Sequence, residues 1–347
     1  MNKIETIKND IMKISKKDLC LMEVCGTHTM SIARTGIRSL LPKNIKIISG
    51  PGCPVCVTPS GEIHAAIQLA RNEDFIIATF GDMLKVPSGD DFLQNYKNVK
   101  VVYSPLDSLK LSKQNPDKEI IFLGIGFETT APLIASTIRA AKQDNLNNFS
   151  VLCMHKIVPP AIEIILKNNT DKKVGGLILP GHVSAITGRK YFDFIKKYKI
   201  SGVVSGFEAT DIMSTICLLV KFYESDKFDI VNNYKGVVSE HGNKIALDMM
   251  NEVFDIQDSQ WRGIGLIKGS GLTIRNKYKK YDAADKFNIV IENIPDPKGC
   301  RCGEVLMAKT TPKDCTLFGK ACTPSNPVGP CMVSSEGTCA AFYKYDL

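Results

Sequence analysis

The sequence predicts an α/β fold in which two parallel-sheet, Rossmann-like domains surround a cleft and a cysteine-rich domain follows at the C-terminus. Three observations support this prediction. Continuous apolar runs alternate with helical patterns up to residue 225, which is typical of parallel strands covered by helices on both faces. Polar turns that contain glycine follow many of these runs, as at the carboxyl ends of parallel strands. Beyond residue 226 the alternation fades, and the segment after residue 295 is rich in cysteine, proline, glycine and threonine.

The first domain is predicted to span residues 1–115. It opens with a charged amphipathic helix over residues 1–17, where isoleucines recur at helical spacing. Four apolar runs then predict its strands: residues 19–24, 45–49, 75–80 and 99–103. The first strand leads through the motif Cys-Gly-Thr-His-Thr to a helix over residues 31–40. The second leads through the motif Cys-Pro-Val-Cys to a helix over residues 61–71.

The second domain is predicted to span residues 116–225. Its expected strands are residues 119–124, 150–154, 174–179 and 200–205. The motif Gly-Phe-Glu-(Thr/Ala)-Thr occurs twice, from Gly126 and from Gly206, each time between a strand and a helix. The glutamate and threonines of each copy can either cap the following helix or line a shared cleft.

The third domain is predicted to span residues 226–347. Residues 263–272 indicate a turn-rich strand pair. The glycines of this segment lack the Gly-Lys-Ser/Thr ending and the strand-to-helix context of a phosphate loop. The tail from residue 295 has little apolar core of its own, so we expect a bound group to help fold it.

Length and charge narrow the class of protein. The 347 residues, 44% hydrophobic and 23% charged, are ordinary for a globular chain of two or three domains. No apolar run reaches the ~18 residues that span a bilayer, and the N-terminus lacks an apolar signal core, so we expect a cytoplasmic protein without membrane contact. The net charge of +8 comes from scattered lysines. Their pattern argues against nucleic-acid binding and leaves an acidic protein partner open.

Twelve cysteines in a reducing compartment point to metal or redox chemistry rather than to structural disulfides. In the Cys-Pro-Val-Cys motif, Cys53 and Cys56 can close a disulfide, share a metal ion or do neither. Three other cysteines lie in apolar runs and are expected in the core: Cys20, Cys153 and Cys217.

Six of the twelve cysteines lie in the tail between residues 300 and 339. Zinc sites usually combine two Cys-x-x-Cys-like pairs, whereas this tail has Cys300 and Cys302 followed by wide gaps. The spacing therefore favours a four-cysteine iron–sulfur cluster over zinc, because each corner of a cubane binds one thiolate. Six thiols are two more than a cubane needs. The spare pair can form a disulfide beside the cluster, which is an oxidoreductase arrangement.

Five motifs in the same order resemble the HypD family of hydrogenase maturation factors. The resemblance runs from about residue 20 to the C-terminus and includes each predicted domain. The motifs are MEVCGTHT (residues 22–29), GPGCPVCVTP (50–59), GFETTAP (126–132), PGHVSAI (180–186) and the tail GCRCGEVL…CTLFGKACTP…GPCMVSSEGTCAA (299–341).

The resemblance implies a scaffold that works with a small partner, HypC. Together the two proteins hold the iron atom on which two cyanides and one carbon monoxide are assembled for [NiFe]-hydrogenase. In the family, HypE delivers the cyanide, with HypF, and the finished Fe(CN)2CO unit passes to the hydrogenase large subunit. This implies a metallochaperone-like function, with thiol redox chemistry and ligand transfer as open enzymatic activities.

The resemblance also implies one [4Fe-4S] cluster on four cysteines separated by 14, 6 and 16 residues. The sequence has this spacing at Cys300, Cys315, Cys322 and Cys339. The spare pair is then Cys302 and Cys331. We expect these two side chains to lie close to the cluster as a candidate redox-active disulfide, as in ferredoxin:thioredoxin reductase.

Within the resemblance, Cys25 is the expected ligand of the iron that carries cyanide and carbonyl, because a soft thiolate suits low-spin Fe(II). His28 is a candidate ligand, proton donor or hydrogen-bond partner of bound cyanide, with a purely structural histidine as the alternative. For Cys53 and Cys56 we favour reversible dithiol/disulfide chemistry over static metal binding. The flanking prolines predict a rigid, exposed loop.

Polar residues at other strand ends are expected to line the cleft, where such folds bind ligands. They can orient Cys25, relay protons during cyanide transfer or contact a partner. These candidates are Glu128, Thr129, Thr130, His182, Ser184 and Glu208. Asp82 and His155 are weaker candidates, and His64 and His241 are expected to be surface or structural residues.

Three hypotheses compete at this stage. The first is the assembly scaffold, the second a stand-alone iron–sulfur oxidoreductase acting on disulfides, and the third a nucleotide-binding module. The third lacks a phosphate-loop motif. Cys25 separates the first two, because a pure disulfide reductase has no use for the Cys-Gly-Thr-His-Thr motif.

Overall fold

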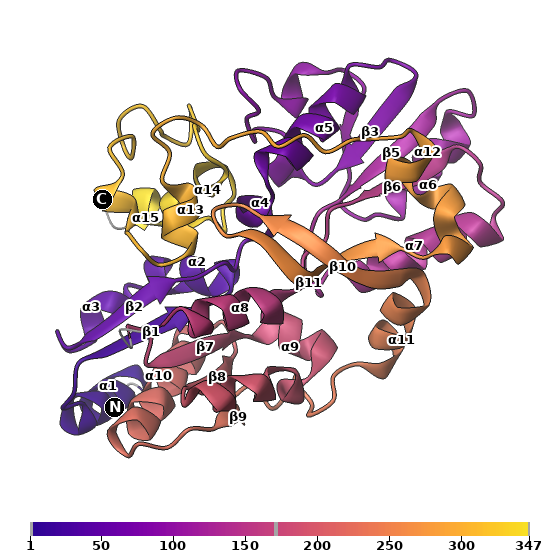
Figure 1. Ribbon diagram of the computed structural model, residues 1–347. Helices are drawn as coiled ribbons and strands as arrows, with labels where there is room; N and C mark the ends of the chain where they lie inside the picture. Colours follow the sequence, from indigo (N-terminus) through magenta and orange to yellow (C-terminus); the bar gives the residue numbers. More distant parts are fainter. Residues whose placement is uncertain (1–2, 170–172, 346–347) are drawn as a thin grey trace.

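The computed structural model describes residues 3–169 and 173–345, which form two parallel sheets, a long antiparallel hairpin and a cysteine-rich tail (Figure 1). The predicted α/β class with two parallel-sheet domains is therefore confirmed. The five-stranded sheet has the order β2 (Ile45–Ser49), β1 (Leu19–Glu23), β7 (Gly176–Pro180), β8 (Ser201–Ser205) and β9 (Ile230–Asn232). The four-stranded sheet has the order β4 (Val99–Val101), β3 (Phe75–Thr79), β5 (Glu119–Gly124) and β6 (Phe149–Cys153). The hairpin joins β10 (Phe254–Trp261) and β11 (Gly265–Ile274).

One face of the five-stranded sheet is covered by helices whose buried isoleucines and leucines pack on the strands. Ile11 of α1, Ile32 of α2 and Ile212 of α10 belong to this core, together with Leu21 of β1. The predicted N-terminal amphipathic helix is thus present and buries its apolar stripe against the sheet. These helices are α1 (Lys3–Ile14), α2 (Gly26–Arg34), α3 (Ile37–Leu40) and α10 (Ala209–Glu224).

The four-stranded sheet is covered on both faces, which explains why its strands are continuous apolar runs in the sequence. Phe122 of β5 and Ile134 of α7 lie in the core on one face, and Leu272 brings the hairpin onto the same core. The helices on this part of the chain are α5 (Ser60–Ala70), α6 (Asp107–Gln114), α7 (Ala131–Gln143), α11 (Lys244–Val253) and α12 (Ala283–Lys286).

A third core lies between the two sheets and continues into the cysteine-rich tail. It contains Leu123, Leu179, Cys56 and Cys331, which come from four distant parts of the sequence. The elements that bring these parts together are α8 (Val158–Lys167), α9 (Gly181–Thr187) and the 3-10 helix η3 (Arg189–Tyr198). The tail therefore folds on the core of the α/β region.

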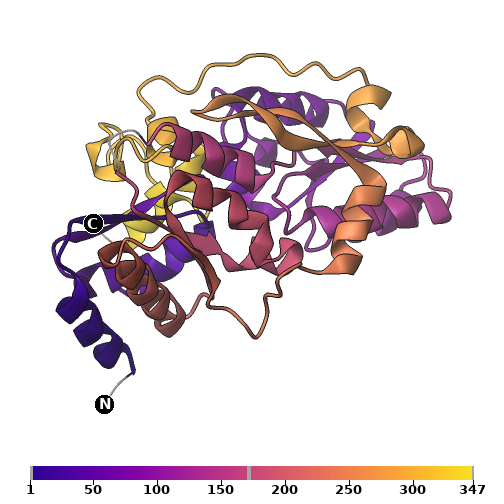
Figure 2. The same cartoon turned by 60° about the horizontal axis from the view of Figure 1, so that its bottom comes forward.

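The tail reaches this position through an extended connection after α12, which crosses the molecule beside the four-stranded sheet (Figure 2). Its elements are short. The last helix packs on α2, and two others pack on α4. The elements of the tail are α13 (Cys302–Leu306), η5 (Pro312–Asp314), α14 (Pro330–Val333) and α15 (Thr338–Tyr345), and α4 is the short helix Pro54–Val57 that follows β2.

The sheets divide the chain differently from the predicted boundaries at residues 115 and 225. Strands β1 and β2 pair with β7, β8 and β9, while β3 to β6 form the other sheet. In the chain, the four-stranded unit is therefore inserted between β2 and β7 of the five-stranded sheet. Strand β9 belongs to the five-stranded sheet, although it lies in the predicted third domain. Apolar runs predict strands but not their neighbours, because pairing depends on contacts between distant residues.

Two further details differ from expectation. The Cys-Gly-Thr-His-Thr motif is not a turn before a helix, because α2 already begins at Gly26 with Cys25 as its N-cap residue. The predicted strand pair at residues 263–272 is the turn and second strand of a longer hairpin. In the described part of the chain no helix has the length and apolar character needed to cross a membrane.

Candidate functional site at the carboxyl ends of the strands

The candidate residues follow the carboxyl ends of the strands, as predicted. Cys25 follows β1, Cys53 follows β2, His182 follows β7 and Glu208 follows β8, all in the five-stranded sheet. In the four-stranded sheet, three candidates stand in equivalent places after β3, β5 and β6: Asp82, Glu128 and His155.

The motifs that contain Cys25 and Cys53 are joined through their backbones. The N–H of Gly26 donates to the carbonyl of Gly52 at 2.9 Å. A Cβ atom at Gly52 would overlap the backbone of Cys25, so glycine is required for the two loops to approach this closely. Pairing of the adjacent strands β1 and β2 thus places the two cysteine motifs side by side.

Cys25 is a buried thiol held at the start of α2. Glu23, fully buried, accepts a hydrogen bond from the N–H of Cys25 at 3.0 Å and another from the hydroxyl of Thr29. Burial raises the pKa of Cys25 to about 12, and the Glu336 carboxyl adds to this, while the N–H groups of His28 and Thr27 lower it. In the metal-free chain Cys25 is therefore a thiol, and any metal that binds there must displace its proton.

His28 is fully buried next to aromatic rings. Its Nε2 lies 3.0 Å from the carbonyl oxygen of Gly206, and its ring stacks on Phe207 at 4.7 Å. His182 stacks on the same ring at 4.0 Å. Burial lowers the pKa of His28 to about 4, so the ring is neutral at physiological pH. Phe207 therefore contacts both candidate histidines, which follow the adjacent parallel strands β1 and β7.

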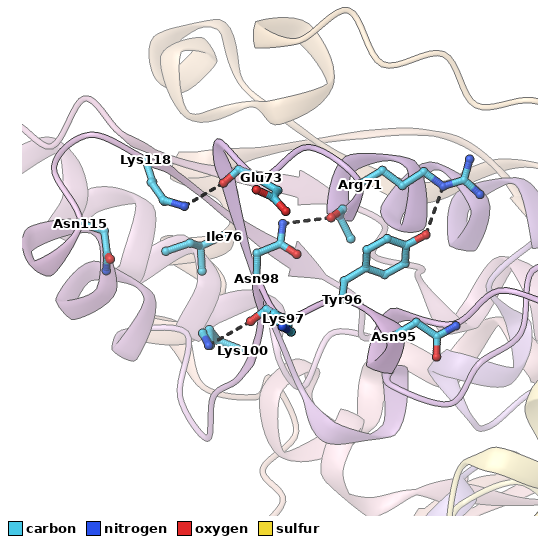
Figure 3. A pocket seen from close by; sticks show the side chains of 11 residues that line it. Arg71, Glu73, Ile76, Asn95, Tyr96, Lys97, Asn98, Lys100, Asn115 and Lys118 are labelled. Carbon is cyan, nitrogen blue, oxygen red and sulfur yellow. Dashed lines mark hydrogen bonds between the residues drawn. The ribbon is translucent and has the colours of Figure 1, made fainter.

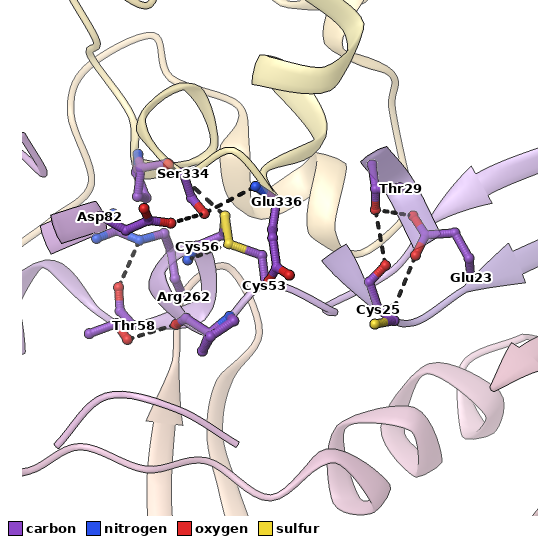
Figure 4. Close-up of a disulfide and its surroundings, with 12 residues drawn as sticks. Glu23, Cys25, Thr29, Cys53, Cys56, Thr58, Asp82, Arg262, Ser334 and Glu336 are labelled. Carbon is purple, nitrogen blue, oxygen red and sulfur yellow. Dashed lines mark hydrogen bonds between the residues drawn. A yellow bond between two sulfur atoms is a disulfide. The ribbon is translucent and has the colours of Figure 1, made fainter. Parts of the chain in front are cut away.

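Cys53 and Cys56 form a disulfide on the short helix α4 (Figure 4). The prediction of an exposed loop was wrong, because both side chains are buried, at 3% and 0% exposure. The reason is tertiary: α13 and α14 of the tail pack on α4 and cover it. The sulfur of Cys56 lies 4.0 Å from the carbonyl oxygen of Pro330, directly before Cys331.

All six tail cysteines line one cavity, together with the apolar side chains of Leu317 and Phe318. The thiol of Cys302 interacts with those of Cys300 and Cys331. No group of three or more His, Cys, Asp and Glu residues within the described ranges converges on a single metal ion. A cubane has a different requirement, because each thiolate binds a separate iron, and a ring of cysteines around an apolar cavity is the donor set it needs. The cysteines of the cavity are Cys300, Cys302, Cys315, Cys322, Cys331 and Cys339.

The two Gly-Phe-Glu motifs have different functions in the fold. Glu208 is exposed and is the N-cap residue of α10, where its N–H donates to Asp211 at 3.4 Å. Glu128 is buried and accepts hydrogen bonds from the N–H of Val158 and the hydroxyl of Tyr191, both at 3.0 Å. Burial raises the pKa of Glu128 to about 7. Glu208 is therefore the N-cap residue of the helix after its motif, whereas in the first copy that position is taken by Thr130 and not by Glu128.

The remaining candidates lie at helix starts or in the core. Thr130 is the N-cap residue of α7, Thr129 is half-buried beside it, and Ser184 is buried in α9. His155 is buried 3.4 Å from the sulfur of half-buried Cys153, and burial lowers its pKa to about 3. His64 bonds to Ser88 and His241 lies beside Lys190, as expected of structural or surface residues. Of the three cysteines expected in the core, Cys217 is buried, whereas Cys20 and Cys153 are only half-buried.

Sequence reasoning missed a carboxylate in the tail. The hydroxyl of Thr27 donates to Glu336 at 2.6 Å, and the backbone of Glu336 lies against Gly26. Ser334, two residues earlier, donates to Asp82 at 2.8 Å, which connects this weaker candidate to the same region (Figure 4). The signal was an acidic residue between two cysteines of the tail motif, but its partner is 309 residues away in the sequence.

Arg262, at the hairpin turn, was also missed. Its Nε donates to the carbonyl of Thr58 at 2.9 Å, its Nη1 donates to Ser60 and pairs with Asp296, and its N–H donates to Val57. These bonds hold the segment that follows the disulfide. Nothing in the local sequence around Arg262 indicates this arrangement.

A separate polar cavity of about 690 Å³ lies at the opposite edge of the four-stranded sheet (Figure 3). Its basic side chains are largely engaged within the chain: Arg71 bonds to Tyr96 and Asp91, and Lys118 to the carbonyl of Glu73. This cavity is near the amino ends of β3, β4 and β5 and contains none of the predicted site residues.

Comparisons with known proteins agree with the motifs. The profile of the HypD family, described as "Hydrogenase formation hypA family", matches residues 2–346. The hydrogenase maturation factor HypD of Cupriavidus necator is 43% identical over 336 residues, covering 93% of this chain and 89% of the relative. HypD of Rhodobacter capsulatus is 40% identical over 352 residues, covering 99% and 93%. HypD of Escherichia coli is 39% identical over 337 residues, covering 95% and 90%.

Proposed function

Because the chain belongs to the HypD family and so acts in hydrogenase maturation, we propose that it is the scaffold on which, with HypC, the Fe(CN)2CO unit is assembled. The observation that carries this proposal is that three sets of cysteines from distant parts of the chain lie next to one another. Cys25 lies beside the loop of the Cys53–Cys56 disulfide, and the six-cysteine tail covers both.

In this proposal Cys25 is the protein ligand of the iron cargo. It stands at the end of β1 and at the N-terminus of α2, where two backbone N–H groups point toward its sulfur. Those N–H groups favour a thiolate, and a thiolate is a good ligand for low-spin Fe(II) with cyanide and carbonyl. His28 is neutral and its ring is fixed by Phe207, so it can orient the site without carrying charge.

We propose that the tail cavity binds a [4Fe-4S] cluster through Cys300, Cys315, Cys322 and Cys339, with Cys302 and Cys331 as the spare thiols. The donor set supports this, because six thiols surround one largely apolar cavity. Such a cluster would supply electrons one at a time. Cys302 and Cys331 interact with each other.

The Cys53–Cys56 disulfide is the proposed redox partner of these thiols. Its helix α4 packs on both elements that carry Cys302 and Cys331. In a reducing cytoplasm a buried disulfide must be protected from solvent thiols to persist, and the tail provides that cover. We propose that this pair cycles between disulfide and dithiol during assembly.

We further propose HypC as the partner that shares the iron, HypE (with HypF) as the source of cyanide, and the hydrogenase large subunit as the recipient. The stand-alone disulfide oxidoreductase remains the second candidate, because the disulfide does lie against the cysteine cavity. The oxidoreductase hypothesis does not explain why Glu23, Thr29 and Glu336 surround a buried Cys25.

The test is the variant Cys25→Ala, purified without oxygen in complex with HypC. We expect the visible absorbance of the cluster to persist and the infrared bands of iron-bound cyanide and carbonyl to disappear. The matched control is Cys20→Ala, since Cys20 is a half-buried cysteine of β1, the strand that Cys25 follows. If the infrared bands survive in Cys25→Ala, Cys25 is not the ligand and the oxidoreductase hypothesis gains.

A further inference from the structure

The two oxygen atoms of the Glu128 carboxyl group have different surroundings. Oε1 accepts hydrogen bonds from the N–H of Val158 and the hydroxyl of Tyr191, each at 3.0 Å. Oε2 is buried and has no hydrogen-bond partner in the described part of the chain. The side chain is only 1% exposed, so water does not compensate for that lack at the surface.

The two donors come from different parts of the fold. Glu128 follows β5 of the four-stranded sheet. Val158 begins α8, which leads from that sheet to the five-stranded sheet, and Tyr191 lies on η3, which packs on β8 and β9. The hydroxyl of Tyr191 therefore reaches Glu128 from the other sheet. Glu128 does not cap the helix that follows its own motif; it accepts the first N–H of α8 from a distance, and its Oε2 is left without a hydrogen-bond partner among the described residues.

The position of the exchangeable proton follows from these contacts. A carboxyl oxygen that accepts two hydrogen bonds has no room for a proton, so in the neutral acid the proton must lie on Oε2. Tyr191 acts as a donor throughout, because burial and the neighbouring Glu128 raise its own pKa. Glu128 thus presents one fixed oxygen and one oxygen that can gain or lose a proton.

Neighbouring charges do not dominate this site. Burial raises the pKa of Glu128, while the N–H groups of Val158 and of Glu128 itself, together with the Tyr191 hydroxyl, lower it. On the adjoining loop, the ammonium of Lys156 is paired with Glu62, and burial keeps His155 neutral. The balance between burial and these three hydrogen-bond donors is therefore what sets the pKa of Glu128.

We propose that Tyr191 is a positioning residue that holds Oε1 of the Glu128 carboxyl group, so that Oε2 is the oxygen that gains and loses the proton. Tyr191 touches neither of the cysteine sites described above and acts only through Glu128. The use of that proton in cofactor assembly rests on the proposed function. The proton equilibrium itself does not, and it can be measured on the full chain alone.

The experiment is an infrared pH titration of the full-length protein, in which Glu128 is identified by subtracting the spectrum of Glu128→Gln. The carbonyl stretch of a protonated carboxyl group is separate from the amide bands. We expect a midpoint of about 7 in the unsubstituted protein. In Tyr191→Phe the midpoint should rise by about one to two pH units, because a hydrogen bond that favours the carboxylate is lost while the ring remains.

Tyr198→Phe is a matched control, since Tyr198 lies on the same 3-10 helix and donates to another carboxylate, Glu163, at 2.9 Å. It should leave the Glu128 midpoint unchanged. The proposal is overturned if Tyr191→Phe keeps the original midpoint, or if Tyr198→Phe moves it equally. A melting curve of each variant, compared with the unsubstituted protein, detects unfolding, which would abolish rather than shift the Glu128 signal. Cyanide and carbonyl bands in the HypC complex test the proposed function separately.

Discussion

The buried ion pair between Lys156 and Glu62 allows a quantitative test of how the disulfide segment is held. Lys156 is 1% exposed, and its Nζ lies 2.6 Å from Glu62 and 2.8 Å from the hydroxyl of Ser259. Glu62 lies in α5, which directly follows the disulfide helix. The pair thus ties that segment to the loop after β6 and to the hairpin.

The perturbation is Lys156→Met, which keeps the volume of the side chain and removes its charge. It leaves the Glu62 carboxylate buried and unpaired. Breaking a buried pair in this way costs about 3–5 kcal/mol of unfolding free energy. The control is Lys113→Met, which breaks a pair of similar length, 2.7 Å to Asp144, whose side chains are 57% and 43% exposed. An exposed pair is worth about 0–1 kcal/mol.

The effect depends on pH with a defined sign. Burial raises the pKa of Glu62, and Lys156 opposes that rise. Without Lys156 the folded-state pKa moves further above the unfolded value of about 4.3. An acid whose pKa is raised on folding destabilises the protein increasingly as pH rises above the unfolded value. The stability loss in Lys156→Met should therefore be smaller near about pH 5 than near about pH 8.

Urea denaturation of the full chain at both pH values measures this loss. The double variant Glu62→Leu/Lys156→Met should recover most of it, because an apolar pair leaves no buried charge. Equal losses for Lys156→Met and Lys113→Met, or a loss in Lys156→Met that does not change with pH, would refute the reasoning.

Two further predictions concern the cysteine sites. If the tail binds the proposed cluster, Cys315→Ala should lose most of the iron and loosen the tail, since metal-binding free energy would then be folding free energy. Chemical iron analysis and limited proteolysis check this, and unchanged iron would exclude the four-ligand assignment. Gly52→Ala should cost about 1–3 kcal/mol or more in urea denaturation, because its Cβ overlaps the backbone of Cys25. Gly236→Ala, with nothing within 4 Å of the added atom, should stay within about 0.5 kcal/mol, and equal effects of the two substitutions would contradict the close approach.

Much of the site was predictable because its residues follow apolar runs. The position after a strand predicted that Cys25, His182 and Glu128 lie at the carboxyl ends of sheets, and the structure places them there. What the two Gly-Phe-Glu copies do was not predictable. Glu128 and Glu208 have the same local sequence context, yet one is buried between the sheets and the other caps a helix at the surface.

The contacts of the tail were also beyond local reasoning. Glu336 reaches Thr27, and Ser334 reaches Asp82, across more than 250 residues of chain. The tail also buries Cys53 and Cys56, which the flanking prolines had suggested to be exposed. In each case the local sequence does not show which distant segment packs on the motif.

By itself, the sequence determined the α/β class, because apolar periodicity is a local property that can be read along the chain. It also supplied the five motifs whose resemblance to the HypD family the comparisons confirm. Only the tertiary structure decided that β1 and β2 pair with β7, that the Cys53–Cys56 disulfide lies beneath the cysteine-rich tail, and that Glu128 is held from the other sheet by Tyr191. The physical reason is that strand order and burial arise from packing between residues far apart in sequence. No local pattern encodes which distant surface a buried group will meet.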